Sequence, residues 1–134
     1  MRRRADIRAE QGQSAVEFAL VLPLLIVLLL GILEFGIAFY HYLTLADAAR
    51  VGARKAITVR IGGTSPTDAA QAVRDAAGGL DQSRLDVSVD DPDWATAGSQ
   101  ITVRATYPYT INIPLLGMSL VSGTLTAEAK ERLE

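Results

Sequence analysis

An uncharged apolar run from Phe18 to Leu33 constrains this chain more than any other stretch. Its sixteen residues would extend about 24 Å as an α-helix, slightly less than the ~30 Å hydrocarbon core of a bilayer. Beyond Glu34 the sequence stays apolar and aromatic to Leu43, which supplies the missing length. The run therefore predicts a membrane-spanning helix. The aromatic residues expected near its far interface are Phe39, Tyr40 and Tyr42.

A carboxylate, Glu17, lies just inside the apolar edge of this run. A charged side chain costs about 2.5–3.5 kcal/mol in the middle of a membrane and less near its edge. Glu17 is therefore expected to have a positive partner. Cleavage after Gly12 would create one, the new α-amino group of Gln13, on the same or a neighbouring chain. Alternatively, Glu17 is a snorkelling residue of an ordinary signal anchor and Gly12 is incidental. A secretory signal peptide is disfavoured, because the apolar run continues without an A-x-A-like cleavage site.

The order of glycine, four residues, glutamate and phenylalanine resembles the cleavage site of type IV prepilins. More closely, GQSAVEFALVLPLLIVLLLGILEFGIAFY followed by LADAARVGARKA is similar to the TadE-like family of pilin-like proteins from tight-adherence (Flp-type) systems. The similarity is looser from residue 57 to the C-terminus. The resemblance implies cleavage between Gly12 and Gln13 by a prepilin peptidase, and a role in assembly and axial register for Glu17 and Phe18. Pro23 is expected to kink the apolar helix, as in pilins or in any membrane helix that tolerates proline.

The function implied by this resemblance is structural. The chain would be a pseudopilin or minor pilin that takes part in assembly of an Flp-type pilus. Its expected partners are a prepilin peptidase, other pilin-like subunits, the pilus assembly platform and the lipid bilayer. The alternative is an uncleaved single-pass anchor that displays a small extracytoplasmic protein-binding domain.

Charge is segregated along the chain. Residues 1–12 carry a net charge of +2, residues 44–60 carry +3, and residues 61–134 carry −5 from ten acidic and five basic residues. The positive-inside rule alone therefore does not set the orientation, because both sides of the apolar run carry net positive charge. The basic leader next to the apolar run, together with the resemblance, favours an N-terminus in the cytoplasm and a C-terminal head outside. An acidic head gives no basis for nucleic-acid binding.

The composition offers little material for catalysis or metal binding. The chain has no cysteine and a single histidine, His41, so disulfides are excluded and a transition-metal site is not expected. An acidic cluster could suggest calcium, but it has Asp91 where an EF-hand loop requires glycine. No Ser-His-Asp set, phosphate-binding glycine loop or HExxH motif is present. We therefore expect neither an enzyme nor a cofactor. The cluster consists of Asp86, Asp90, Asp91 and Asp93.

Beyond the apolar run the helix is expected to continue to about Val59. One narrow face of residues 44–58 carries small side chains, which favours close packing against the head or another subunit, or else an alanine-rich helix in solvent. This face contains Leu45, Ala49, Gly52, Ala53 and Ala56. A break at Gly62 and Gly63 follows, and Pro66 suits the first position of a second helix that stops at Gly78 and Gly79.

Alternating residues then predict strands at 84–90 and 100–109, and a third is expected near 120–130. Pro108 should restrict pairing to a sheet edge or a bulge. Residues 111–120 are expected to form an apolar loop that either completes the core or stays exposed until a partner covers it. Trp94 is expected to fold back onto the head. The predicted class is α+β, with a leader at 1–12, a long helix at 13–60, and a head at 61–134 made of one helix on three antiparallel strands.

Overall fold

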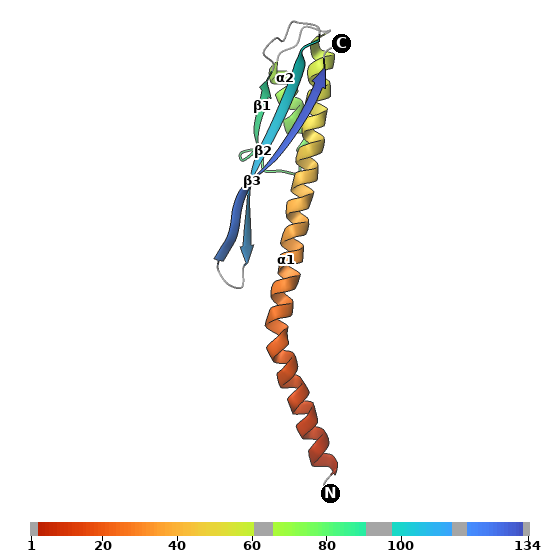
Figure 1. Ribbon diagram of the computed structural model, residues 1–134, viewed down its shortest axis with the longest axis vertical. Helices are drawn as coiled ribbons and strands as arrows, with labels where there is room; N and C mark the ends of the chain where they lie inside the picture. Colours follow the sequence, from red (N-terminus) through yellow and green to blue (C-terminus); the bar gives the residue numbers. More distant parts are fainter. Residues whose placement is uncertain (1–2, 61–65, 91–97, 114–117, 133–134) are drawn as a thin grey trace.

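The structure is a computed structural model that describes residues 3–60, 66–90, 98–113 and 118–132, with side chains over 12–58, 66–90, 98–111 and 122–132. Figure 1 shows one long helix with a shorter helix and a sheet gathered beside its C-terminal half. This arrangement confirms the predicted fold class. The elements in chain order are α1 (Arg3–Arg60), α2 (Pro66–Ala76), β1 (Asp86–Asp90), β2 (Gln100–Ile113) and β3 (Met118–Arg132).

Helix α1 consists of two segments with different surroundings. No residue from Gly12 to Ile37 is buried, and we refer to residues 12–37 as the lower segment. Residues 38–58, the upper segment, contain the first buried residue, Ala38, and pack against α2 and the sheet. Helix α1 ends at Arg60, close to the predicted end at Val59.

The sheet is antiparallel with the strand order β1-β2-β3. Its register aligns Val87 of β1 with Ala105 of β2, and Val103 of β2 with Ala129 of β3. Alternate residues of β2 face the helices and are buried, as the period-two pattern predicts. These are Ile101, Val103, Ala105 and Tyr107.

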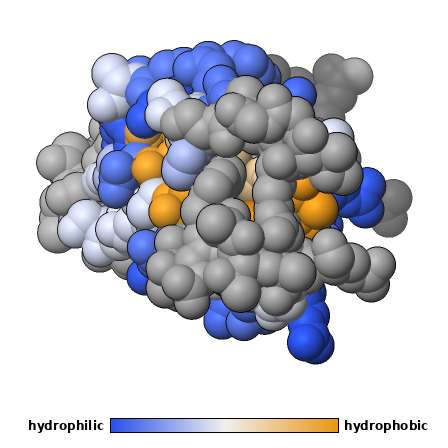
Figure 2. Space-filling model, turned by 90° about the horizontal axis from the view of Figure 1, so that it is seen from above, coloured by the Kyte–Doolittle hydropathy of each residue, from blue (hydrophilic) through white to orange (hydrophobic). Residues whose placement is uncertain are grey.

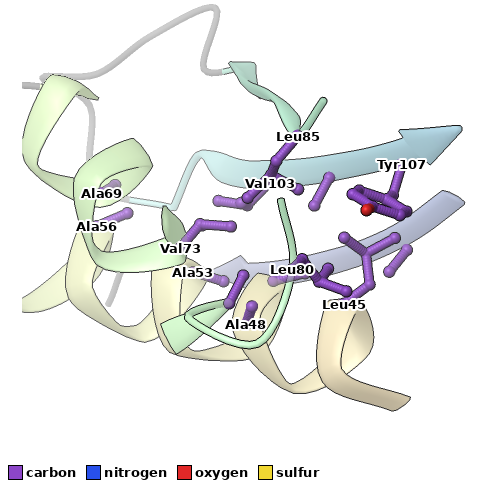
Figure 3. Close-up of a cluster of buried hydrophobic side chains, with 14 of the residues drawn as sticks. Leu45, Ala48, Ala53, Ala56, Ala69, Val73, Leu80, Leu85, Val103 and Tyr107 are labelled. Atoms are coloured by element: carbon purple, nitrogen blue, oxygen red, sulfur yellow. The ribbon is translucent and has the colours of Figure 1, made fainter. Parts of the chain in front are cut away.

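The core lies between the upper segment, α2 and the sheet, and small residues bring the two helices close together (Figure 3). Leu45, Ala53 and Ala56 of α1 are each 0% exposed. At Gly52 the two helices lie too close for a larger residue, because a Cβ atom there would overlap Cγ2 of Val73 and lie 3.2 Å from the carbonyl oxygen of Ala69. The small-residue face of residues 44–58 therefore packs against the head, which is one of its two interpretations.

Helix α2 begins at Pro66, as predicted, and ends at Ala76, just before the two glycines. Beyond its end, the Gln82 side chain donates a hydrogen bond to the Ala77 carbonyl at 3.0 Å. Asp81 accepts hydrogen bonds from the hydroxyl of Ser83 at 2.7 Å and from its backbone N–H at 3.0 Å. These two bonds, the hydroxyl first, lower the pKa of the Asp81 carboxyl.

One local prediction was wrong, and another was confirmed. The stretch 111–120 is not a continuous loop, because β2 extends to Ile113 and β3 begins at Met118, so Ile111, Ile113 and Met118 belong to the ladder. Pro108 lies in the central strand, paired with Thr124. Because β1 pairs only with residues 102–106, the side of β2 away from β3 has no strand at Pro108, so Pro108 lies at a local edge of the sheet, as predicted. Asp91, Asp93 and Trp94 lie outside the described residues.

The head has a polar exterior. Viewed from the end at which α1 terminates, the described residues at the periphery are mostly hydrophilic, and hydrophobic colour shows mainly toward the middle (Figure 2). The outward residues of β1, which are Asp86, Ser88 and Asp90, are exposed. Among the residues whose side chains the structure describes, the exposed large apolar ones lie on α1.

Candidate functional site

The predicted processing and register residues all lie on the lower segment. Gly12 is exposed, and an added Cβ atom there would meet nothing within 4 Å. Phe18 is 64% exposed. Gln13 donates a hydrogen bond from Nε2 to Oε1 of Glu17 at 3.1 Å, across one helical turn. In the intact chain, the side chain of Gln13 is thus a partner of Glu17, which the sequence prediction did not anticipate.

The backbone around these residues is helical throughout. Because α1 begins at Arg3, the peptide bond between Gly12 and Gln13 lies inside the helix. The helix also continues through Pro23. Figure 1 shows the axis of α1 changing direction in its red-to-orange part. The assignment of this bend to Pro23 stays a prediction.

Large apolar side chains cover the lower segment and are exposed to the surroundings. Leu24 is 74% exposed and Phe35 is 70% exposed. Phe35 and Phe39 stack with ring centroids 6.3 Å apart along one side of the helix. Among the described residues, one helix is long and apolar enough to cross a membrane, and it extends over Gly12–Thr58. An exposed surface of this size and length is typical of a helix that lies in lipid or in a bundle of other helices.

A second candidate site lies where the head meets α1. Here an open cavity of about 280 Å³ separates α1 from β2. Arg84 donates a hydrogen bond from Nη2 to the Pro108 carbonyl at 3.0 Å, and its guanidinium lies 5.2 Å from the centre of the Tyr107 ring. His41 of α1 meets the same ring edge-on at 5.6 Å. The cavity is lined by Glu34, Ile37, His41, Arg84, Tyr107, Pro108, Tyr109 and Thr110.

The sequence prediction did not identify this cavity as a site. One signal was available, because Glu34 is the only carboxylate between Glu17 and Asp47 and follows directly on the uncharged run. Arg84 and Tyr107 carried no such signal, because they meet only when β2 passes the α2–β1 connection. The cavity is lined by a carboxylate, an imidazole and a guanidinium. Side chains of this kind are typical of the edge of an apolar environment, where their polar ends can stay in water.

Charged groups elsewhere on the head form surface ion pairs. Glu128 of β3 contacts Lys130 at 3.0 Å and Arg104 at 3.4 Å. The hydrogen bond from Lys130, followed by the charges of Lys130 and Arg104, lowers the pKa of the Glu128 carboxyl. Within the described ranges, no group of three or more His, Cys, Asp or Glu residues could hold a metal ion. Exposed pairs of this kind contribute little to stability and do not form a reactive centre.

Comparison with known proteins identifies the segment that contains these features. The TadE-like protein family matches residues 12–54, which begin at Gly12 and include the lower segment and most of the upper segment. No curated protein and no solved structure matches the chain. The matched residues contain the predicted processing site, the exposed apolar surface and Gly52. Over residues 12–54, about a third of the chain, this protein thus matches the TadE-like family.

Proposed function

We propose that this protein is a pseudopilin or minor pilin that takes part in assembly of a tight-adherence, Flp-type pilus. The observation that carries the proposal is the lower segment, a helix matched to the TadE-like family on which most of the large apolar side chains are exposed. Such a helix needs lipid before assembly and other helices after it. The proposed partners are a prepilin peptidase, other pilin-like subunits and the pilus assembly platform, with the N-terminus in the cytoplasm and the head outside.

The chemistry proposed for the N-terminus is removal of residues 1–12. Hydrolysis of the peptide bond between Gly12 and Gln13 leaves a carboxylate on Gly12 and an α-amino group on Gln13. Glu17 would then neutralise the amino group of a neighbouring subunit. That contact fixes one helix against the next along the pilus axis, because an unpaired carboxylate in an apolar bundle is costly. The Gln13–Glu17 hydrogen bond supports this step, since it shows that Glu17 accepts a donor presented from position 13.

The intact mass of the protein purified from the membranes of its own host tests the cleavage. Loss of residues 1–12, with Gln13 as the new N-terminus, is the expected result. A full-length chain in cells whose prepilin peptidase is active on another substrate would overturn it. The protein would then be an uncleaved single-pass anchor that displays a small binding domain.

The register role of Glu17 is tested by the variant Glu17→Gln. It should insert into the membrane normally and lose most of its incorporation into assembled pili, because the amino group of the neighbour loses its counter-charge. Asp47→Asn is the matched control, since Asp47 is also a carboxylate on α1 but lies in the upper segment, exposed and paired with Arg50 at 3.1 Å. Equal incorporation of both variants would contradict charge neutralisation by Glu17.

A further inference from the structure

A hydrogen bond joins Gln13 and Glu17 at the point of α1 that the proposed cleavage turns into the N-terminus. Nε2 of Gln13 donates to Oε1 of Glu17 at 3.1 Å, and both side chains are exposed. Glu17 is the only ionisable side chain between Glu10 and Glu34. The Gln13 amide is therefore bonded to the one charged acceptor that this part of the helix offers.

The hydrogen bond sets the direction of the Gln13 side chain. Residue 17 lies one helical turn, about 6 Å, further toward the C-terminal end of α1 than residue 13. The Gln13 amide is thus drawn along the helix toward Glu17, whereas the backbone nitrogen of Gln13 lies on the N-terminal side of its Cα atom. The side-chain carbonyl carbon and the backbone nitrogen of Gln13 are kept apart by this arrangement.

A glutamine at the start of a chain undergoes an intramolecular reaction that an internal glutamine does not. The lone pair of its free α-amino nitrogen attacks the side-chain carbonyl carbon, Cδ, and a new N–Cδ bond forms. The Cδ–Nε2 bond then breaks, and Nε2 leaves as ammonia with a proton from the attacking nitrogen. The product is a pyroglutamate ring, and no further reactant is needed. The rate depends on how often the two reacting atoms lie close together in the right orientation.

Cyclisation of Gln13 would remove the charge on which the proposed contact between subunits depends. The ring nitrogen is an amide nitrogen and carries no positive charge, so it cannot serve as the counter-charge of Glu17. The hydrogen bond opposes this reaction, because Cδ cannot approach the amino group while the amide is held at Glu17. A carboxylate has about four acceptor positions on its two oxygens, so Glu17 can hold this amide and still accept an amino group.

We propose that Glu17 protects the processed N-terminus from cyclisation to pyroglutamate by holding the side-chain amide of Gln13. Gln13 is then a modification site, and Glu17 is a positioning residue within its own chain in addition to its proposed contact with a neighbour. The inference rests on the proposed cleavage after Gly12, because only a free Gln13 amino group reacts. In lipid or in a bundle of helices the restraint should be stronger than in water, since the hydrogen bond lies in a lower dielectric.

The rate of ammonia loss from the shortened chain tests the proposal. The full chain is made with the recognition sequence of a sequence-specific protease in place of residues 9–12, so that this protease releases Gln13 as the N-terminus without the prepilin peptidase. The detergent-solubilised protein is incubated near neutral pH, and its intact mass gives the fraction that has lost one ammonia. Glu17→Leu should cyclise at least about twofold faster than the wild type, since side-chain pairs at this spacing shift an equilibrium by about that factor in water.

Three further variants show whether the hydrogen bond is the cause. Glu17→Gln keeps a side-chain oxygen that accepts the bond, so its rate should lie closer to the wild type than to Glu17→Leu. Val16→Ala is the matched control, because Val16 is an exposed neighbour outside the hydrogen bond, and its rate should equal that of the wild type. Gln13→Ala should lose no ammonia, which assigns the loss to Gln13. Residues 12–37 contain no buried residue, so these substitutions leave the core of the head unchanged.

The outcomes separate this inference from the cleavage on which it rests. Equal rates for the wild type and Glu17→Leu would overturn the protection by Glu17, and a faster wild type would overturn it too, because Glu17 would then promote the reaction as a proton acceptor. The mass of the chain from its own host reports on cleavage independently. A full-length host chain contradicts the cleavage, whereas a host chain that has lost residues 1–12 and one ammonia in every copy contradicts the protection alone.

Discussion

The two segments of α1 belong to one continuous helix and differ in how their apolar side chains are covered. In the lower segment, large residues are exposed, with Leu24 at 74% and Phe35 at 70%. In the upper segment, small residues are buried, with Ala53 and Ala56 at 0%. Side-chain size and burial are therefore inverted relative to a helix of a soluble protein, in which the large apolar residues form the core.

This inversion has a physical reason. The upper segment meets its partner within the same chain, and α2 can come close only where the helix surface is small, as at Gly52. The lower segment meets the head only near its end, where Glu34 and Ile37 line the cavity with β2. Most of its large side chains are therefore available for lipid or for other helices. Dispersion contacts with such an environment grow with side-chain size. The same helix thus contributes a surface for internal packing at one end and a surface for external packing at the other.

Leu45→Ala should have the largest effect on the head. Leu45 is fully buried in the upper segment, and truncation of a buried leucine leaves a cavity that lowers the free energy of unfolding by about 2–5 kcal/mol. Leu24→Ala, in the lower segment, is the matched control and should change it by less than about 0.5 kcal/mol. Hydrogen exchange of the β2 and β3 amides in the detergent-solubilised full chain measures head opening separately from α1. Equal effects of the two substitutions would contradict the division of α1 into two segments.

The two segments also differ in how far the sequence predicted them. The uncharged run predicted a helix long and apolar enough to cross a membrane, because lipid selects for composition, which can be read directly from the sequence. The face that contains Leu45 and Gly52 was recognised as a packing surface, but its partner was not determined, because small residues suit an intramolecular and an intermolecular contact equally well. The strands were predicted from alternation as far as Tyr109. The continuation to Ile113 was missed, because Pro108 and an uninterrupted apolar stretch conceal the period of two.

The candidate sites also differ in how far the sequence predicted them. Glu17 and Gly12 could be proposed as site residues from the sequence because they stand at fixed spacing within one helix. The cavity beneath the head was missed, because Arg84 and Tyr107 are 23 positions apart in the sequence and meet through the register of the sheet. Local spacing is visible in a sequence, whereas a cavity formed by the meeting of three elements depends on tertiary packing.

Gly52→Ala, in the upper segment, and Gly36→Ala, in the lower segment, should change the free energy of unfolding of the head by different amounts or in opposite directions. Alanine favours a helix over glycine by about 1 kcal/mol, and Gly36 has open space around an added Cβ atom, so Gly36→Ala should not destabilise the head. At Gly52 the added methyl overlaps Val73, which should lower the free energy of unfolding by about 1–3 kcal/mol.

Thermal unfolding of the two glycine variants, followed by circular dichroism in the same detergent, measures this difference. The double variant Gly52→Ala/Val73→Ala provides the control for the mechanism. The double variant should lose less stability than the sum of the losses of Gly52→Ala and Val73→Ala, because removal of the valine methyl relieves the overlap. Additive losses would show that α1 and α2 do not approach each other as closely as the structure has them.

The smallest effect is expected from charge. Glu128 has a lowered pKa in the folded head because of Lys130 and Arg104. A carboxyl whose pKa is lower when folded contributes stability above its unfolded pKa, about 4.3, and loses that contribution as the pH falls through the folded value. The wild type should therefore lose slightly more stability than Glu128→Gln between about pH 5 and pH 3.

Melting temperatures of the wild type and Glu128→Gln, measured side by side across this pH range, check that small difference. Both proteins keep Asp81, whose pKa is lowered by Ser83, so each should still lose some stability in acid and only the contribution of Glu128 should separate them. The separation should also shrink in high salt, because the groups are exposed. A separation as large as the effect of Leu45→Ala would mean that charge and not apolar packing holds the sheet against the upper segment.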